Sequence, residues 1–485
     1  MTPSSAHCSI VPPYVLSALA ASADPRLQSS ARGTLRTDEL LRRGRVTAEV
    51  RPEPTAPPGE DAFPRLAPGT EDGPQRAVFD AAGGTQLPGT LARGEGDPAT
   101  ADEQVEQAYD GLGATWQLWQ DAYGRTSLDG KGLPLLASVH YGQDYDNAFW
   151  DGRQMVFGDG DGVVFLPFTR SLDVIGHELA HGVTQYTSGL NYQGQSGALN
   201  ESVSDVFGVL VAQYLRGQSA VEADWLIGAD LLAPGVAGVA LRSMAAPGTA
   251  YDDPRLGTDP QPAHMRDYVD TTADNGGVHI NSGIPNKAFH DLAVALGGNA
   301  WGTAGQIWYD TIVGDIRADC DFETFAGLTV AAAAARFGAG SAEESAVRAA
   351  WAGVGLGPDA RPQEDEPPVA DTPDGPTPDD PGPEDPAPGP GTAVRVRRSG
   401  GVTGLVRERT VTLSELPAPD AHHWRSLLVA GRLRRIAESA RPAESFPDSF
   451  SWSVSCERPP VDVDLPEPAL TEEVRALLQR TVRPD

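Results

Sequence analysis

Apolar residues follow two different patterns between residues 74 and 356, and each predicts a different kind of secondary structure. From about 75 to 170, short apolar runs such as Ala77-Val78-Phe79 stand between turn residues, which predicts strands, with one helix around 101–123. From 172 to 356 the apolar spacing is mainly helical. We therefore expect an α+β domain in which a β-rich part precedes a helical part.

Two proline-rich segments separate this domain from the rest of the chain. Residues 51–73 are rich in Pro, Gly and Glu, which predicts a flexible joint. Residues 357–392 are dominated by proline and acidic residues, so they cannot bury a core and are expected to form an extended linker. Residues 1–50 precede the joint as an amphipathic, partly helical segment.

Residues 393–485 differ in composition from the linker and are numerous enough for a small independent domain. Strand-like alternation occurs at 394–398 and 402–412. Helix-like spacing follows near 421–439 and 471–481. We expect an α/β or β-rich fold for this piece.

The amino-acid composition limits the kinds of partner that we expect the protein to bind. The 485 residues are 40% hydrophobic, which is enough for a sizeable core and two or three domains. The net charge of −30 argues against nucleic acid and anionic membranes as partners, and its simplest use is solubility. No stretch approaches the roughly 20 apolar residues that a membrane span needs, so we expect no membrane insertion.

The N-terminal apolar stretch and the cysteines bear on location. Residues 15–23 end like a signal-peptide cleavage site, but no Lys or Arg precedes them and Pro12-Pro13 interrupt the apolar run. We expect a cytoplasmic protein, or one exported without a classical signal peptide. The three cysteines (Cys8, Cys320 and Cys456) lie too far apart in the sequence to indicate a disulfide framework.

The stretch His177-Glu178-Leu179-Ala180-His181 points to specific chemistry. Histidines four residues apart lie on one face of a helix, so both imidazoles can bind one metal ion. The glutamate between them is placed to act as a general base, which is the arrangement of a zinc hydrolase. So short a motif also occurs by chance, and alone it leaves both interpretations open.

A third metal ligand is expected, because catalytic zinc ions usually have three protein ligands. Glu201 is the candidate, since it belongs to a stretch that predicts a buried helix, where a carboxylate needs a partner. Asp205, one turn later, is placed to accept the free imidazole N–H of a ligand histidine, and Asn200 is a second candidate for that role.

The chain is similar to the thermolysin family of metallopeptidases in six separate motifs, which occur in the family's order and spacing. They are Asn147–Trp150, His177–His181, Gly189–Tyr192, Asn200–Asp205, Leu241–Met244 and Asp274–Gly283. The resemblance implies a two-lobed peptidase over residues 74–356, with the zinc-binding helix between a β-rich and a helical lobe. It also implies one Zn²⁺ ion, held by His177, His181 and Glu201.

The resemblance assigns further roles position by position. Glu178 matches the general base, and His279, oriented by Asp274, matches the hydrogen-bond donor to the carbonyl oxygen that becomes negative. Tyr192 matches a second such donor; taken alone, it would be an ordinary core aromatic, and His279 an ordinary loop histidine. The groups matched to substrate-backbone binding are Asn147, the carbonyl of Ala148 and Arg242.

The resemblance also bears on specificity and on calcium. The family's pocket maps to six apolar residues, which implies cleavage on the amino side of bulky hydrophobic residues: Phe165, Phe168, Val174, Ile227, Leu231 and Leu241. Calcium ligands of the family map to Asp173, Ala212, Asp224, Leu226 and Ala229. Only the two aspartates can bind Ca²⁺, which needs several oxygen ligands, so calcium binding is doubtful.

The two ends of the chain resemble regulatory segments. Cys8 to Leu16 resembles the short propeptide of protealysin-like members of the family, which implies that residues 1–50 cover the cleft until self-cleavage between about residues 40 and 72. Cys8 itself leaves two interpretations open, a thiolate ligand of zinc and a small buried side chain.

Residues 393–485 open with Val394 to Gly404, which resembles emfourin, a protein inhibitor of protealysin-like peptidases. This implies an inhibitor tethered to its own target, at an effective concentration of about millimolar. The alternative is a β-rich recognition or targeting module with no effect on activity.

The sequence is therefore consistent with two hypotheses from different functional classes. One is a zinc-dependent neutral endopeptidase that acts on peptides or proteins and is made as a latent precursor. The other is a catalytically silent peptide-binding protein. Every matched catalytic position holds the family's residue, which favours the enzyme.

Overall fold

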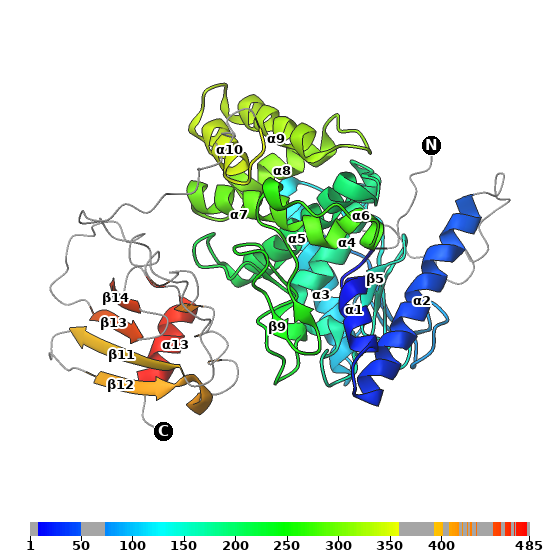
Figure 1. Ribbon diagram of the computed structural model, residues 1–485, viewed down its shortest axis with the longest axis horizontal. Helices are drawn as coiled ribbons and strands as arrows, with labels where there is room; N and C mark the ends of the chain where they lie inside the picture. The colour runs from blue at the N-terminus through cyan, green and yellow to red at the C-terminus, as the bar shows by residue number, and fades with distance from the viewer. Residues whose placement is uncertain are drawn as a thin grey trace, which may run out of the picture. The chain divides into compact units, whose positions relative to one another are not determined.

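The computed structural model describes residues 8–49, 73–357, 392–400, 407–416, 450–456, 461–466 and 472–482, with single positions at 420, 424, 427, 428, 433 and 470. The chain divides into two compact units, the larger of which contains residues 1–220 and 225–362 (Figure 1). The predicted joint and linker fall almost entirely outside the described residues. Within the described residues, no helix has the length and apolar character needed to cross a bilayer.

A six-stranded sheet forms the β-rich part of the larger unit. Its strands, in the order β1-β5-β6-β4-β2-β3, are β1 (Cys8–Ser9), β5 (Ala148–Trp150), β6 (Met155–Phe157), β4 (Leu135–Val139), β2 (Arg76–Asp80) and β3 (Thr90–Gly94). β2, β4 and β6 run parallel, whereas β1 pairs antiparallel with β5 at one edge. The edge strand thus comes from the N-terminal segment, while all other strands follow residue 75.

Helices α4 (Leu172–Tyr186) and α5 (Gly194–Arg216) pack closely against each other and carry the candidate metal ligands. Their close approach requires glycine, because a Cβ atom on Gly208 would lie 2.4 Å from the carbonyl oxygen of Asp173. α4 also contacts β5, so it lies between the sheet and the helical part. The buried helix predicted around Glu201 is confirmed as α5, which begins seven residues before it, at Gly194.

The larger unit contains further helices and several short strands besides this helix pair. The predicted helix around 101–123 is confirmed as α3 (Glu103–Tyr123), which packs on the sheet. The mainly helical remainder is also confirmed: α6 (Asp274–Asn281), α7 (Gly283–Leu296), α8 (Thr303–Val313), α9 (Phe322–Phe337) and α10 (Ala342–Gly353). Short paired strands lie between α5 and α6: β7 (Leu226–Ile227), β8 (Arg242–Ser243), β9 (Asp252–Asp253) and β10 (Gly257–Thr258).

Two helices confirm that the N-terminal segment is partly helical: α1 (Pro13–Ala20) and α2 (Pro25–Glu49). α1 buries Val15, Leu16 and Leu19 completely or almost so. α2 buries the polar side chains of Thr34 and Asp38, which indicates that it packs against polar groups of the larger unit.

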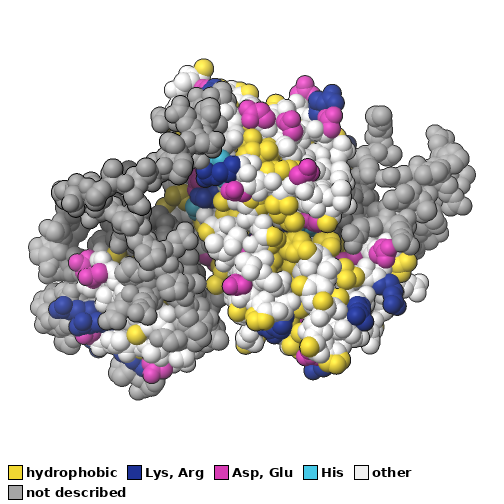
Figure 2. Space-filling model, in the orientation of Figure 1, with side chains coloured by type: hydrophobic (Ala, Val, Ile, Leu, Met, Phe, Trp, Pro, Cys, Tyr) yellow, Lys and Arg dark blue, Asp and Glu magenta, His cyan; other side chains and the backbone are white. Residues whose placement is uncertain are grey.

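The acidic excess is dispersed over the visible face of the larger unit. Figure 2 shows acidic side chains scattered there among basic and apolar ones. Several acidic groups pair with arginine, such as Glu95 with Arg76 and Asp310 with Arg336. The acidic side chains drawn on this face therefore do not form one large patch.

The smaller unit is an antiparallel four-stranded sheet with a helix. The strands, in the order β12-β11-β13-β14, are β12 (Arg407–Thr412), β11 (Ala393–Gly400), β13 (Phe450–Cys456) and β14 (Val461–Pro466), and the helix is α13 (Glu472–Val482). The expected strand from 402 lies outside the described residues as far as 406. Sequence reasoning missed β13 and β14, whose buried Trp452, Val454 and Leu465 alternate with serine and aspartate.

Candidate active site

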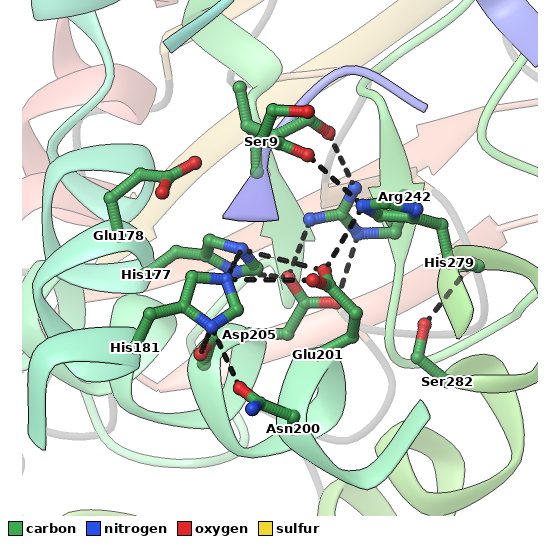
Figure 3. Close-up of polar contacts among 12 residues, drawn as sticks. Ser9, His177, Glu178, His181, Asn200, Glu201, Asp205, Arg242, His279 and Ser282 are labelled. Carbon is green, nitrogen blue, oxygen red and sulfur yellow. Dashed lines mark hydrogen bonds and ion pairs between the residues drawn. The ribbon is translucent and has the colours of Figure 1, made fainter. Parts of the chain in front are cut away.

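His177 and His181 of α4 face Glu201 of α5 across the helix contact (Figure 3). The Nε2 atoms of the two histidines lie 3.1 Å apart. Glu201 approaches both, with Oε2 at 3.6 Å from Nε2 of His177 and Oε1 at 3.5 Å from Nε2 of His181. All three side chains are buried, and their ligand atoms lie within 4.8 Å of one another.

This donor set fits a tetrahedral zinc ion. Zinc–nitrogen bonds of about 2.0–2.1 Å at tetrahedral angles place two nitrogen ligands about 3.3 Å apart, close to the observed spacing. Burial lowers the pKa of His181 to about 4, which leaves its imidazole neutral with a lone pair for a metal. Oε2 of Glu201 is buried and accepts no hydrogen bond from the described residues, so it too has a free lone pair.

The other nitrogen of each histidine is held by a polar side chain. Nδ1 of His177 lies 2.8 Å from Oδ1 of Asp205, and Nδ1 of His181 lies 2.8 Å from Oδ1 of Asn200. Asn200 accepts the Nδ1 proton of His181, and the charge of Asp205 beside Nδ1 of His177 favours a proton on that nitrogen, so both Nε2 lone pairs are left for a metal. Asn200 is itself fixed, because its Nδ2 donates to the carbonyl of Leu190 at 3.0 Å.

Asp205 also binds Arg242, and the pair is almost fully buried. Nε and Nη2 of Arg242 donate to the two oxygens of Asp205 at 2.9 and 2.7 Å. Asn286 of α7 donates a further hydrogen bond to Oδ2 at 2.8 Å. Although burial opposes it, the charge of Arg242 holds the pKa of Asp205 well below its usual range. Sequence reasoning missed Asn286, which lies outside the family motifs.

Glu178 is buried beside the metal position and has an unoccupied oxygen. Its Oε2 accepts a hydrogen bond from the backbone N–H of Trp150 at 3.0 Å, whereas Oε1 has no partner among the described residues. Burial, followed by the charge of Glu201, raises the pKa of Glu178 well above its usual value. A carboxylate in this state takes up a proton readily, as a general base must.

His279 is held by Asp274 on the opposite side of the site. Asp274 accepts hydrogen bonds from Nδ1 of His279 at 2.7 Å and from its backbone N–H at 2.9 Å. Burial opposes protonation, but the charges of Asp274 and Glu201 raise the pKa of His279 to about 9. The hydroxyl of the half-buried Tyr192 lies 3.2 Å from Nε2 of His279 and donates to Oε1 of Glu201.

Comparison with known protein families agrees with this geometry. The family described as "Thermolysin metallopeptidase, catalytic domain" matches residues 71–185, and "Thermolysin metallopeptidase, alpha-helical domain" matches residues 188–356. The chain belongs to the thermolysin family of metallopeptidases. It is therefore a zinc metalloendopeptidase, with the family's two-lobed fold and a separate C-terminal unit. The emfourin family matches residues 396–482 of that unit.

Individual relatives refine the placement of this thermolysin-family peptidase. It is 50% identical over 350 residues to "Extracellular metalloprotease" of Pectobacterium carotovorum subsp. carotovorum, covering 72% of this chain and 96% of the relative. It is 41% identical over 289 residues to "Thermolysin" of Alicyclobacillus acidocaldarius subsp. acidocaldarius, covering 58% and 50%. The solved precursor of protealysin, a metalloproteinase from Serratia proteamaculans, is 48% identical with a TM-score of 0.65, covering 72% of this chain and all of that one.

The six apolar residues expected to line the specificity pocket are all almost fully buried. The rings of Phe165 and Phe168 lie 5.8 Å apart. Leu231 and Leu241 approach each other at Gly228, where an added Cβ atom would lie 2.9 Å from Leu241 and 3.3 Å from Leu231. Ile227 accepts a backbone hydrogen bond from Leu241 at 2.9 Å, and Val174 lies one turn before His177 on α4.

The N-terminal segment of this thermolysin-family peptidase contacts the residues matched to substrate binding. Ile10 donates its N–H to the carbonyl of Ala148 at 3.1 Å and accepts at its own carbonyl from Nη1 of Arg242 at 3.0 Å. Val11 donates its N–H to Oδ1 of Asn147 at 2.9 Å. Nε2 of His279 lies 3.0 Å from the carbonyl oxygen of Ser9 (Figure 3).

Helix α2 adds hydrogen bonds to residues 145–147, next to the contacts of residues 9–11. Asp38 accepts hydrogen bonds from the hydroxyl of Tyr145 and from Nδ2 of Asn147, the latter at 3.1 Å. The hydroxyl of Thr34 accepts the N–H of Asp146 at 3.0 Å, and Ser30 donates to the Asp146 carboxyl group. Asn147, the residue expected to bind the substrate backbone, is thus held between the segment at Val11 and the helix at Asp38.

Proposed function

We propose that this chain is the latent precursor of an endopeptidase that cuts on the amino side of bulky hydrophobic residues, with its N-terminal segment as internal blocker. The observation that carries the proposal is the set of hydrogen bonds between residues 9–11 and four groups of the site: Asn147, Ala148, Arg242 and His279. These groups are the ones expected to bind a peptide substrate, so they cannot do so while residues 9–11 occupy them.

Each residue of the site has a distinct task in peptide hydrolysis. When bound, the zinc ion polarises a water molecule and stabilises negative charge on the substrate carbonyl oxygen. Glu178 removes a proton from that water and later delivers it to the nitrogen of the departing amine. His279 and Tyr192 donate hydrogen bonds to the carbonyl oxygen as its charge grows, and Arg242 holds the next carbonyl along the substrate.

The proposed specificity rests on the apolar pocket beside Arg242. Because Leu241 directly precedes Arg242, a substrate residue whose carbonyl binds this arginine places its side chain near the buried cluster of Leu231 and Leu241. A bulky aliphatic or aromatic side chain gains about 25 cal/mol for each Å² of apolar surface that it buries there. The predicted products therefore begin with residues such as Leu, Ile or Phe.

Two comparisons support latency. The match to the protealysin precursor covers 72% of this chain, more than the region matched by the two thermolysin families, 71–356. The emfourin match over 396–482 supports an inhibitory role for the C-terminal unit, which we propose to act on the same chain. We place self-cleavage between about residues 40 and 72, and the name "Extracellular metalloprotease" of the Pectobacterium relative favours export as the location.

Comparing the wild-type chain with Glu178→Ala tests the enzymatic proposal. After removal of the N-terminal segment, the wild type is expected to hydrolyse a chromogenic peptide with Leu after the scissile bond. The variant is expected to be about 10²–10⁴-fold slower, because it lacks the general base. Equal rates, or no hydrolysis by either protein, would favour the silent peptide-binding alternative.

A further inference from the structure

The N-terminal segment has a defined direction and register in the cleft. β1 runs antiparallel to β5, with Cys8 opposite Trp150 and Ser9 opposite Phe149. The pairing continues by one residue, because the N–H of Ile10 donates to the backbone carbonyl of Ala148, and Val11 then donates its N–H to the side-chain Oδ1 of Asn147. Three consecutive residues therefore pair with the strand without a shift in register, as an added β-strand does.

One peptide bond of this segment lies between the groups that hold a substrate for hydrolysis. On one side of the Ser9–Ile10 bond, the carbonyl oxygen of Ser9 lies 3.0 Å from Nε2 of His279. On the other side, the N–H of Ile10 donates to the carbonyl of Ala148 at 3.1 Å. The next carbonyl, that of Ile10, accepts from Arg242. The carbonyl aimed at the expected charge-stabilising donor thus belongs to Ser9.

We propose that the Ser9–Ile10 bond is itself a cleavage site, which the enzyme hydrolyses within its own chain before the N-terminal segment leaves. The inference rests on the proposed function, and it adds a specific bond to it. Ile10 is fully buried and is the kind of bulky hydrophobic residue that the proposed specificity selects. Glu178 lies near this segment, because it accepts a hydrogen bond from the backbone N–H of Trp150, the strand partner of Cys8.

The step is an ordinary hydrolysis and consumes only water. The water oxygen adds to the carbonyl carbon of Ser9, and Glu178 accepts the proton that the water loses. The bond between that carbon and the nitrogen of Ile10 then breaks, and the proton passes from Glu178 to the nitrogen. The products are a fragment that ends in the Ser9 carboxylate and a chain that begins with the amine of Ile10.

Cleavage here does not by itself open the site. The contacts of the carbonyl of Ile10 with Arg242 and of Val11 with Asn147 lie after the bond, on the part that stays attached to α1 and α2. Leu16 and Leu19 remain buried with it. The cut chain is therefore expected to stay latent until a second cut frees residues 10–50.

N-terminal sequencing of the full-length chain tests the proposal. The chain is purified without metal, loaded with zinc, and sampled by sequencing and intact-mass measurement. We expect a new N-terminus reading Ile10-Val11-Pro12, formed at a rate independent of protein concentration, as a reaction within one chain requires. Glu178→Ala, treated identically, is expected to form this N-terminus at least a hundredfold more slowly.

Two variants of Ile10 test the register. Ile10→Leu keeps a bulky hydrophobic residue after the bond, and its cleavage is expected to stay within about threefold of the wild-type rate. Ile10→Asp places a charge in an apolar site, and cleavage is expected to slow at least tenfold. A new N-terminus at Ser9 or Val11 in the wild type would show a different register and overturn the proposal.

Hydrogen exchange gives a readout that needs neither metal nor activity. Pro12 and Pro13 carry no amide hydrogen, so a fragment that covers residues 9–13 reports mainly on Ile10 and Val11. Both amides are expected to exchange slowly in the zinc-free chain, because they donate to Ala148 and Asn147. Fast exchange of both would overturn the proposal.

The outcomes also separate this inference from the proposed function. A zinc-loaded chain that hydrolyses added peptide after processing, yet never shows the Ile10 terminus, overturns the inference and leaves the endopeptidase standing. A chain that cuts neither itself nor added peptide overturns both. Appearance of the Ile10 terminus in the wild type alone, with slow exchange before zinc is added, supports both.

Discussion

Asp205 and Arg242 form a two-pronged ion pair, with Nε and Nη2 of the arginine 2.9 and 2.7 Å from the two carboxylate oxygens. The same carboxylate lies 2.8 Å from Nδ1 of His177. One buried aspartate therefore orients both a candidate zinc ligand and the arginine that we propose binds a carbonyl beyond the scissile bond. Metal binding and peptide binding are expected to depend on it together.

Replacing Asp205 with Asn is expected to weaken zinc binding by about 10–100-fold, because His177 loses its charged partner. The KM for a peptide is expected to rise as well, since Arg242 loses the charge that holds it. Competition with a chelating indicator measures the first effect, and steady-state kinetics the second. Asn286→Ala removes a single neutral donor from the same carboxylate and serves as the milder comparison. Unchanged zinc affinity in Asp205→Asn would contradict the prediction.

Local spacing made the cluster of candidate metal ligands predictable from the sequence. His177 and His181 lie four residues apart on a helix, and Asn200, Glu201 and Asp205 follow on the next helix. Asn286 is different, because it reaches Asp205 from 81 residues away and its neighbourhood shows only an ordinary helical pattern. Contacts set by the packing of distant helices leave no periodic signal in one sequence.

The shortest and most irregular elements were also beyond prediction. β5 and β6 have three residues each, too few for an alternating pattern. Asp274 to Gly277 all adopt positive φ values, which breaks helical periodicity just before His279. The placement of His279 therefore came from the resemblance and not from the local pattern.

Loosening α2 is expected to weaken latency. Asp38→Ala removes the hydrogen bonds from Tyr145 and Asn147, each worth about 1.5–3 kcal/mol when the acceptor is charged. Self-processing, followed by gel and peptide assay, is expected to begin at least severalfold sooner than in wild type. Arg32→Ala changes an exposed residue of the same helix and is expected to have no effect. If both variants process at the wild-type rate, α2 does not hold the segment.

Calcium removal is expected to leave thermal stability unchanged. Asp173, one of the two aspartates kept at the family's calcium positions, already accepts hydrogen bonds from the hydroxyl of Ser171 at 2.6 Å and the N–H of Gly228 at 2.5 Å. Burial raises its pKa to about 6, so the charged form that binds calcium is less favoured than in an exposed aspartate. A melting temperature that drops by several degrees on addition of a calcium-selective chelator would reverse this expectation.

The pH dependence of stability is expected to include a contribution from Asp146. Burial, followed by the charges of Asp161 and Asp144, raises its pKa to about 8. Below the unfolded pKa of about 3.9, both states are protonated; above it the unfolded carboxyl group ionises first, so stability falls as pH rises towards 8. Asp146→Asn stays neutral, and its melting temperature is expected to exceed that of wild type increasingly from pH 5 to pH 8. Parallel curves for the two proteins would contradict the assignment.

Cutting the linker is expected to relieve inhibition by the C-terminal unit. This unit has a hydrophobic core of its own around Trp424 and Trp452, so it is expected to stay folded after separation. A site for a specific protease, inserted between residues 358 and 391, allows one preparation to be assayed before and after the cut. A tethered inhibitor experiences an effective concentration of about millimolar. Cutting the linker and diluting the protein to nanomolar concentration is therefore expected to raise the rate of peptide hydrolysis, unless the released unit binds the peptidase very tightly. Two results together would contradict inhibition: an unchanged rate of peptide hydrolysis after the cut, and no binding of the released unit to the peptidase. The C-terminal unit would then be a recognition module.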